Sequence, residues 1–271
     1  LRLFRAESSP GQVITKERFT ERNRDAMIVL WTIYLVLNSS QVLLLLAGGM
    51  SLFDSLCHTF ATVSTSGFSP YNASMGYFDN AYFDWVVIIF MFLGGVSFVL
   101  FYFLARGEWR SFKINTEFRW YVGFVLFFCV AVSLILWEHG TYGLADSGRF
   151  GTFQVVSLLT TTGFTTADYE LWPGAAQVFL FVVCFIGACA GSTTSGIKVV
   201  HFVIICKFMV AAMRKIYFRP LAVVAVRLNG RRIELSVIHL ALCYFIVNIF
   251  LILAGACFMA VVEGMDLLSA T

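Results

Sequence analysis

Long uncharged stretches alternate with charged connections along this chain. Each stretch is long enough for a helix to cross about 30 Å of hydrocarbon, because a helix rises about 1.5 Å per residue. Tryptophans stand near the ends of several stretches, as is typical of membrane interfaces. The pattern predicts spanning helices at 26–50, 85–105 and 120–137, a broken helix at 171–213, and a further span beginning in 235–271.

Two other uncharged segments are rich in Ser, Thr and Gly and do not fit a full crossing. The first opens with a capping-box signature at Ser51 and Asp54, and a helix from there to Ser64 would be only about 21 Å long. Irregular backbone at membrane depth survives only where it lines a cavity or is buried in protein. The sequence therefore predicts re-entrant half-helices followed by polar tracts at 51–69 and 149–166. An interfacial helix is the alternative, but the polar tracts fit it poorly.

Composition agrees with a membrane protein. The 271 residues are 59% hydrophobic and only 13% charged, whereas soluble domains carry about 25% charged residues. These values exclude a water-soluble globular domain and a disordered chain. The seven cysteines show no CxxC spacing, so we interpret them as buried structural thiols.

Basic residues indicate the orientation of the spans. Nearly all of them lie in a linker at 1–25, a loop at 106–119, or the region that ends in a hairpin at 214–234. The positive-inside rule places these connections in the cytoplasm. The hairpin itself is predicted from residue alternation and the turn signal Asn229-Gly230. The opposite connections are acidic, with Arg149 as the single exception. They could concentrate cations at a pore mouth, although a solvated rim would look similar.

The two polar tracts resemble each other. Thr65-Ser66-Gly67-Phe68 matches Thr161-Thr162-Gly163-Phe164, 96 residues later. A half-helix that enters from outside directs its carbonyl end at the membrane centre, which favours a cation there, and a glycine-containing tract can then present backbone oxygens to it. Gly264–Leu268 also resembles Gly49–Phe53, so we expect a third repeat to open near the end and the chain to be an interior piece of a repeat protein.

A run of small residues interrupts the fourth long stretch at 187–197. Glycines and hydroxyl residues at this density favour a loop that lines a cavity. The alternative is a helix that uses small residues for close packing. Lys198 follows the run and is a functional candidate, or else a side chain that reaches the inner interface. The residues of interest are Gly187, Gly191, Ser192, Thr193, Thr194, Ser195, Gly196 and Lys198.

Three stretches carry a specific resemblance. They are SLFDSLCHTFATVSTSGFSPYNASMGYFD, SLLTTTGFTTADYELWPG and FIGACAGSTTSGIKVVHFVIICK. With them the chain resembles the Trk/Ktr/HKT superfamily of K⁺ transporters, and within it the TrkH-type potassium uptake subunits. The resemblance covers nearly the whole chain. It implies an all-α polytopic membrane protein in which four repeats surround one central pore, and this chain would hold the second, the third and the start of the fourth.

The resemblance also implies roles for particular residues. K⁺ would be bound by backbone oxygens at Thr65, Ser66, Thr161 and Thr162, in a selectivity filter that includes Gly67, Phe68, Gly163 and Phe164. The loop at 187–197, together with Lys198, would act as a gate below the filter. Thr194 and Ser195 depart from the more glycine-rich family pattern.

Partners and location follow from the same resemblance. We expect a multi-pass protein of the bacterial inner membrane, surrounded by lipid, that takes up K⁺ by symport as a homodimer. A separate TrkA-like cytosolic subunit would bind the regulatory nucleotide. K⁺ would be the transported ion, with no tightly bound organic cofactor and no nucleic-acid partner.

Other classes of function compete with a K⁺ pore. One is a Na⁺/K⁺-permeable HKT-like transporter, because the first-repeat filter residue that distinguishes the two lies outside this sequence. Another is an ion-coupled secondary transporter, which also uses broken helices. An enzyme finds no support, since no nucleophile–histidine–acid set, metal-ligand spacing or nucleotide loop is present.

Overall fold

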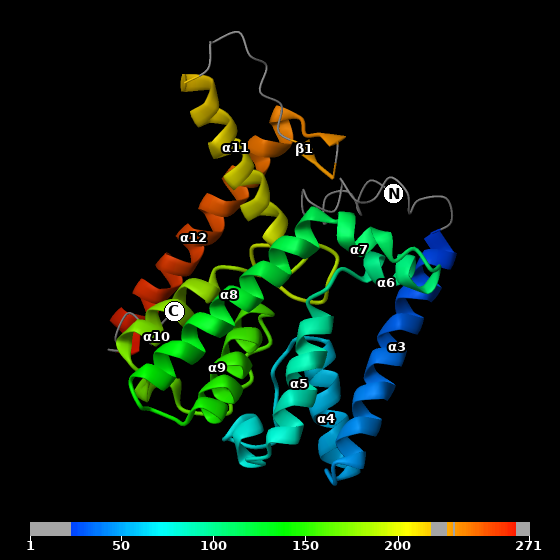
Figure 1. Ribbon diagram of the computed structural model, residues 1–271, viewed down its shortest axis with the longest axis vertical. Helices are drawn as coiled ribbons and strands as arrows, with labels where there is room; N and C mark the ends of the chain where they lie inside the picture. Colours follow the sequence, from blue (N-terminus) through cyan, green and yellow to red (C-terminus); the bar gives the residue numbers. More distant parts are fainter. Residues whose placement is uncertain (1–22, 218–226, 230, 264–271) are drawn as a thin grey trace.

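The computed structural model describes residues 23–217, 227–229 and 231–263. Helices make up most of this part of the chain, and one two-stranded hairpin accompanies them (Figure 1). The all-α fold is therefore confirmed. Most of the predicted linker at 1–25, part of the hairpin at 214–234 and the whole of Gly264–Leu268 lie outside the described residues.

The first repeat unit consists of a long helix, a short helix and a bent pair. The short helix α4 packs between α3 and α5. Its apolar and polar faces differ strongly, and His58, Thr59 and Thr62 are buried on its inner side. In chain order the elements are α3 (Asn23–Ala47), α4 (Leu52–Val63), the 3₁₀ turn η2 (Ser74–Tyr77), α5 (Ala81–Gly94) and α6 (Phe98–Ala105).

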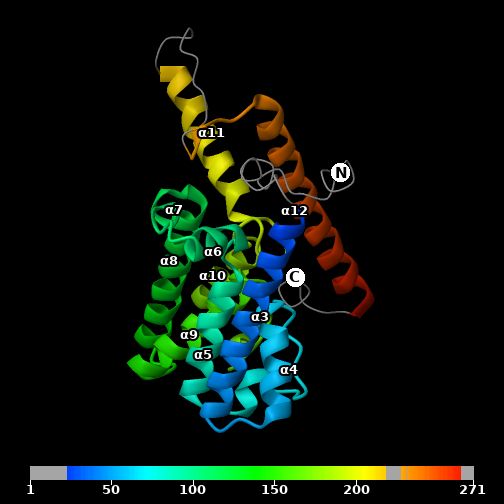
Figure 2. The same cartoon turned by 90° about the vertical axis from the view of Figure 1, so that its right-hand side faces the viewer.

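The second unit repeats this plan, and a hairpin and a last helix follow it. Helix α9 packs against α8, α10 and also α5 of the first unit, so the two units form one body (Figures 1 and 2). Its elements are α7 (Arg110–Ile114), α8 (Thr116–Glu138), α9 (Leu144–Leu159), η3 (Tyr169–Leu171), α10 (Gly174–Cys184) and α11 (Val199–Tyr217). After it come β1 (Arg227–Leu228), β2 (Arg231–Arg232) and α12 (Leu235–Glu263).

Three described helices are long and apolar enough to cross a membrane by themselves. These spans are Met27–Ala47, Thr116–Glu138 and Leu235–Phe258. Large apolar side chains such as Leu43, Phe127 and Phe250 are exposed on them. Such exposure is the rule where lipid is the solvent.

The predicted single helix at 85–105 differs from the structure. Helices α5 and α6 are bent by 92° at a short break after Gly94. At Gly95 a side chain is excluded, because a Cβ would lie 2.3 Å from the Tyr121 hydroxyl. Hydropathy alone does not reveal this break, since every residue around it is uncharged.

The starts of the helices follow from local hydrogen bonding. Ser51 accepts a hydrogen bond from the Asp54 N–H at 3.1 Å and donates to its carboxylate at 2.7 Å. The predicted cap of α4 is thus confirmed, and it fixes where the half-helix begins. Asn80 caps α5 in the same way by accepting from the Tyr82 N–H at 2.9 Å.

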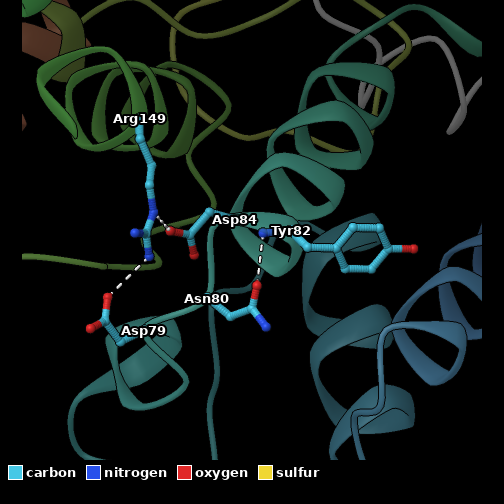
Figure 3. Close-up of polar contacts among 5 residues, drawn as sticks. All are labelled: Asp79, Asn80, Tyr82, Asp84 and Arg149. Atoms are coloured by element: carbon cyan, nitrogen blue, oxygen red, sulfur yellow. Dashed lines mark hydrogen bonds and ion pairs between the residues drawn. The ribbon is translucent and has the colours of Figure 1, made fainter. Parts of the chain in front are cut away.

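One buried ion pair joins the two repeat units. Arg149 on α9 donates from Nε to Asp84 on α5 at 2.5 Å and from Nη2 to Asp79 at 3.2 Å (Figure 3). The Asp84 side chain is 2% exposed, whereas the Asp79 side chain is 83% exposed. Because Asp84 is the buried partner, it is the one that fixes the outer end of α9 against α5.

This contrast leads to a prediction on stability. Asp84→Asn leaves the Arg149 guanidinium without its buried carboxylate, so we expect a loss of about 3 kcal/mol in unfolding free energy. Asp79→Asn, the matched control, should cost less than about 1 kcal/mol because the Asp79 side chain itself is exposed to solvent. Thermal unfolding of both variants in the same detergent checks this. Equal melting temperatures for the two variants would show that the pair does not hold the repeats together.

Candidate functional site

The two polar tracts have the same backbone conformation. Thr65 and Thr161 are left-handed, with φ of 54° and 55°, and so are Gly67 and Gly163, with φ of 67° and 85°. A left-handed threonine costs roughly 1–2 kcal/mol because its Cβ crowds the following carbonyl. The same costly conformation recurs at equivalent positions of both repeats, which makes these tracts the candidate site.

Hydrogen bonds at the ends of the two half-helices also correspond. The N–H groups of Ser66 and Gly67 both donate to the Ala61 carbonyl, at 2.9 and 3.4 Å. In the second repeat Thr162 and Gly163 both donate to the Ser157 carbonyl, at 2.8 and 3.4 Å. Each tract therefore begins by closing the last turn of its half-helix, which carries the negative end of the helix dipole.

Side chains behind the second tract hold it in place. Ser157 donates to the Phe164 carbonyl at 2.7 Å, and the hydroxyls of Thr160 and Thr162 lie 2.8 Å apart. Phe164 is fully buried next to His58, with ring centroids 5.9 Å apart. Its counterpart Phe68 is 80% exposed within the described part of the chain.

The two tracts lie directly against each other. A Cβ on Gly67 would lie 1.9 Å from the Thr162 carbonyl oxygen, so only glycine fits there. Farther along, the Gly76 N–H donates to the Thr165 carbonyl at 3.1 Å. Around Gly163, by contrast, a Cβ would meet open space. The structure thus brings together all eight predicted filter residues in two adjacent, equivalent segments.

An irregular loop separates α10 from α11, in the stretch where the sequence predicts a broken helix. Helix α10 ends at Cys184 and α11 begins at Val199. The loop pairs its backbone with the break between α5 and α6: Cys189 donates to the Gly95 carbonyl at 3.0 Å, and Phe98 donates to the Gly191 carbonyl at 3.0 Å. Each irregular segment therefore supplies hydrogen-bond partners for backbone groups of the other. Backbone at membrane depth needs such partners within the protein.

The loop is also hydrogen-bonded to the first residue of each tract. The Thr65 hydroxyl donates to the Thr193 carbonyl at 3.1 Å. Thr161 accepts from the Ser195 N–H at 2.9 Å and from its hydroxyl at 3.0 Å. Both left-handed threonines are thus fixed by the loop, which lies against the inner end of the two tracts.

Two charged side chains lie at the loop. Lys198 donates from Nζ to the carbonyl and the hydroxyl of Thr194. Glu117, at the start of α8, accepts from the Ala190 N–H at 2.6 Å and is only 4% exposed. Sequence reasoning missed Glu117, because an acidic residue in a charged loop has no distinguishing signal. It also treated Arg149 only as an exception to the charge pattern.

The remaining candidates have simpler explanations. His58 is buried, with Nδ1 2.8 Å from the Asp54 carbonyl oxygen and Nε2 3.1 Å from the Ser69 hydroxyl. All seven cysteines are free thiols, but the prediction that they are buried is wrong for most of them. Only Cys129 and Cys189 are buried within the chain, Cys57 is partly exposed, and the other four are exposed. Within the described residues no group of three or more His, Cys, Asp or Glu side chains could hold a metal ion.

Comparison with known proteins identifies relatives over most of the chain. The family model TrkH, described as a cation transport protein, matches residues 21–268. A Trk system potassium uptake protein TrkH from Halomonas elongata is 37% identical, over 84% of this chain and 47% of that protein. The TrkH protein of Escherichia coli K12 is 34% identical, over 90% of this chain and 50% of its own length.

A solved structure shares the fold. The crystal structure of the potassium transporter TrkH from Vibrio parahaemolyticus superposes with a TM-score of 0.85 at 29% identity. The superposition covers 94% of this chain and 55% of the TrkH chain in that crystal structure. The chain spans about half the length of the curated relatives it matches. Since the family model matches all but the ends of the sequence, the chain belongs to the TrkH family of cation transport proteins.

Proposed function

We propose that this chain forms part of the pore of a potassium uptake system, in which a backbone filter selects the ion and the loop at 187–198 gates it. One observation carries the proposal. The same strained backbone follows both half-helices, and one loop is hydrogen-bonded to the first residue of both tracts. The names of the relatives, which are Trk system potassium uptake proteins, support K⁺ as the ion.

The filter works by replacing the water shell of the ion. Backbone oxygens of Thr65, Ser66, Thr161 and Thr162 are the proposed ligands, and the half-helices α4 and α9 direct their negative ends toward the same region. Carbonyl dipoles stabilise a cation without binding it so tightly that it cannot leave. The hydrogen bonds behind Phe164 keep the second tract from collapsing onto the ion.

The loop is the proposed gate because it lies below the tracts and its contacts can be exchanged. Its small residues can move without repacking large side chains, and glycine absorbs large dihedral changes. Gly191 and Gly196 are both left-handed, with φ of 77° and 72°. Lys198 adds a positive charge that repels a permeating cation until the loop moves.

Assembly and location complete the proposal. A location in the bacterial inner membrane, ion symport, a homodimer and a TrkA-like cytosolic regulatory subunit each rest on the resemblance to the family. The hairpin at 214–234 is the proposed contact for that subunit, because it is a basic connection on the side that the positive-inside rule assigns to the cytoplasm.

Ion flux tests the proposal directly. The full-length protein that carries this sequence, reconstituted in vesicles, should take up Rb⁺ at least about tenfold faster than Na⁺, as a carbonyl filter selective for K⁺ requires. Empty vesicles are the control. Equal uptake of the two ions would favour the HKT-like alternative, and uptake of neither would refute a cation pore.

The two filter glycines should respond differently to the same substitution. Gly163→Ser places a side chain in open space within the described residues, so the protein should still fold. The side chain strains a left-handed backbone by about 1–2 kcal/mol, which should lower the preference for Rb⁺ over Na⁺. Gly67→Ser collides with the Thr162 carbonyl and should abolish uptake. Gly174→Ser, at an open position without positive φ, is the matched control. Unchanged ion preference in Gly163→Ser would remove Gly163 from the filter.

The hydrogen bonds between loop and filter should hold the gate closed. Thr161→Val keeps the branched shape but loses the acceptor for both Ser195 groups. Two lost hydrogen bonds, each worth about 1 kcal/mol, should raise basal Rb⁺ uptake about tenfold or more. Thr166→Val is the control, because the buried Thr166 hydroxyl has no hydrogen-bond partner among the described residues. If the two variants conduct alike, the Thr161 hydroxyl does not restrain the gate.

A further inference from the structure

The hairpin β1–β2 contacts the first turn of α8. The Asn229 side chain accepts a hydrogen bond from the Thr116 N–H at 2.9 Å, and the neighbouring Leu228 is only 2% exposed. The first turn of a helix has N–H groups without partners inside the helix. Asn115 caps one of them by accepting from Phe118 at 2.9 Å. The hairpin, which follows α8 by almost one hundred residues, supplies a second cap.

The residue after Thr116 is the buried Glu117. Its carboxylate accepts from the Ala190 N–H in the loop. It therefore joins α8 to the loop.

These contacts form a short path from the cytoplasmic hairpin to the gate. We propose that Glu117 is a positioning residue that holds the loop at 187–198 closed, and that the hairpin acts on the loop through Asn229, Thr116 and Glu117. The inference rests on the proposed gate function of the loop. A displacement of the hairpin removes a cap from the first turn of α8, and Glu117 lies in that turn. The carboxylate then shifts relative to Ala190, and the loop loses a contact on its cytoplasmic side.

The path differs from the contacts on the filter side of the loop. Thr65 and Thr161 bond to Thr193 and Ser195, whereas Glu117 bonds to Ala190, nearer the start of the loop. The break between α5 and α6 holds the loop from a further direction, through Gly95 and Phe98. Of these contacts, the one to Glu117 is adjacent to the hairpin, so a signal that moves the hairpin would act there.

Hydrogen exchange of the loop tests the path without depending on ion flux. In the full-length protein, Glu117→Ala should speed exchange of the amides at 187–198 about tenfold or more, since the buried Ala190 N–H is left without its acceptor. Glu117→Gln keeps an acceptor oxygen and should change the rate less than about threefold. Glu108→Ala, an exposed glutamate on the same connection, should leave it unchanged.

Variants of the hairpin tip test the other half of the path, from the hairpin to Glu117. Asn229 is left-handed, with φ of 49°, so Asn229→Gly removes the acceptor without backbone strain, and Asn229→Asp retains the acceptor. Asn229→Gly should speed exchange in the loop in the same direction as Glu117→Ala, and Asn229→Asp should not. The double variant should exchange no faster than Glu117→Ala alone, because both substitutions break one path.

Rb⁺ uptake by the same variants links the path to gating. Basal uptake should rise in the order wild type, Asn229→Gly, Glu117→Ala. If loop exchange is unchanged in Asn229→Gly, or if the two effects add fully, the hairpin does not act through Glu117. Should Glu117→Ala fail to fold, Asn229→Gly against Asn229→Asp still decides the outcome. A wild-type protein without any Rb⁺ uptake would refute the proposed function, while the exchange rates would still decide whether the path exists.

Discussion

Backbone groups at membrane depth must find partners within the protein, and the centre of this structure depends on that constraint. Two segments leave helical geometry there, the break after Gly94 and the loop before Val199. Alone, each would leave N–H and carbonyl groups unpaired. Together they exchange hydrogen bonds at Gly95, Phe98, Cys189 and Gly191. The break in the first unit is therefore not independent of the loop in the second. A gate that moves must replace these hydrogen bonds, by water in an opened cavity or by other backbone groups.

The filter tracts show how an unfavourable local conformation is maintained. A left-handed threonine is costly by itself, yet it occurs in both units at the same position. In each case the hydroxyl of that threonine bonds to the loop, so contacts from a distant segment help to offset the local strain. Filter geometry and loop position are consequently linked. In the proposed function, selectivity and gating would therefore be properties of one hydrogen-bonded assembly.

Much of the architecture was predictable because its signals are local. Span lengths follow from hydropathy, the start of α4 from Ser51 and Asp54, and the equivalence of the two tracts from a repeated Thr-Gly-Phe pattern. The missed features depend on partners far away in sequence. Asp84 and Arg149 are individually ordinary charged residues, and only the packing of α9 against α5 makes them a buried pair. Glu117 likewise has no distinguishing signal in the sequence, because its partner Ala190 is distant along the chain and becomes a neighbour only in the fold. At the bend between α5 and α6, the Phe92 carbonyl accepts a hydrogen bond from Tyr121, which lies on another helix.

The contact between Gly67 and the Thr162 carbonyl has a consequence for how such repeats can diverge. Copies of a duplicated unit usually drift apart in sequence wherever a side chain can be exchanged for another. Here one copy touches the other through bare backbone, so no exchange of side chains at this point can compensate for a change. Within the described residues, Gly67 is restricted by its neighbour as well as by its left-handed φ, whereas Gly163 is restricted by its dihedral angle alone. Two residues that look identical in the repeated motif are therefore under different constraints, and only one of them is open to replacement in a relative with altered ion preference.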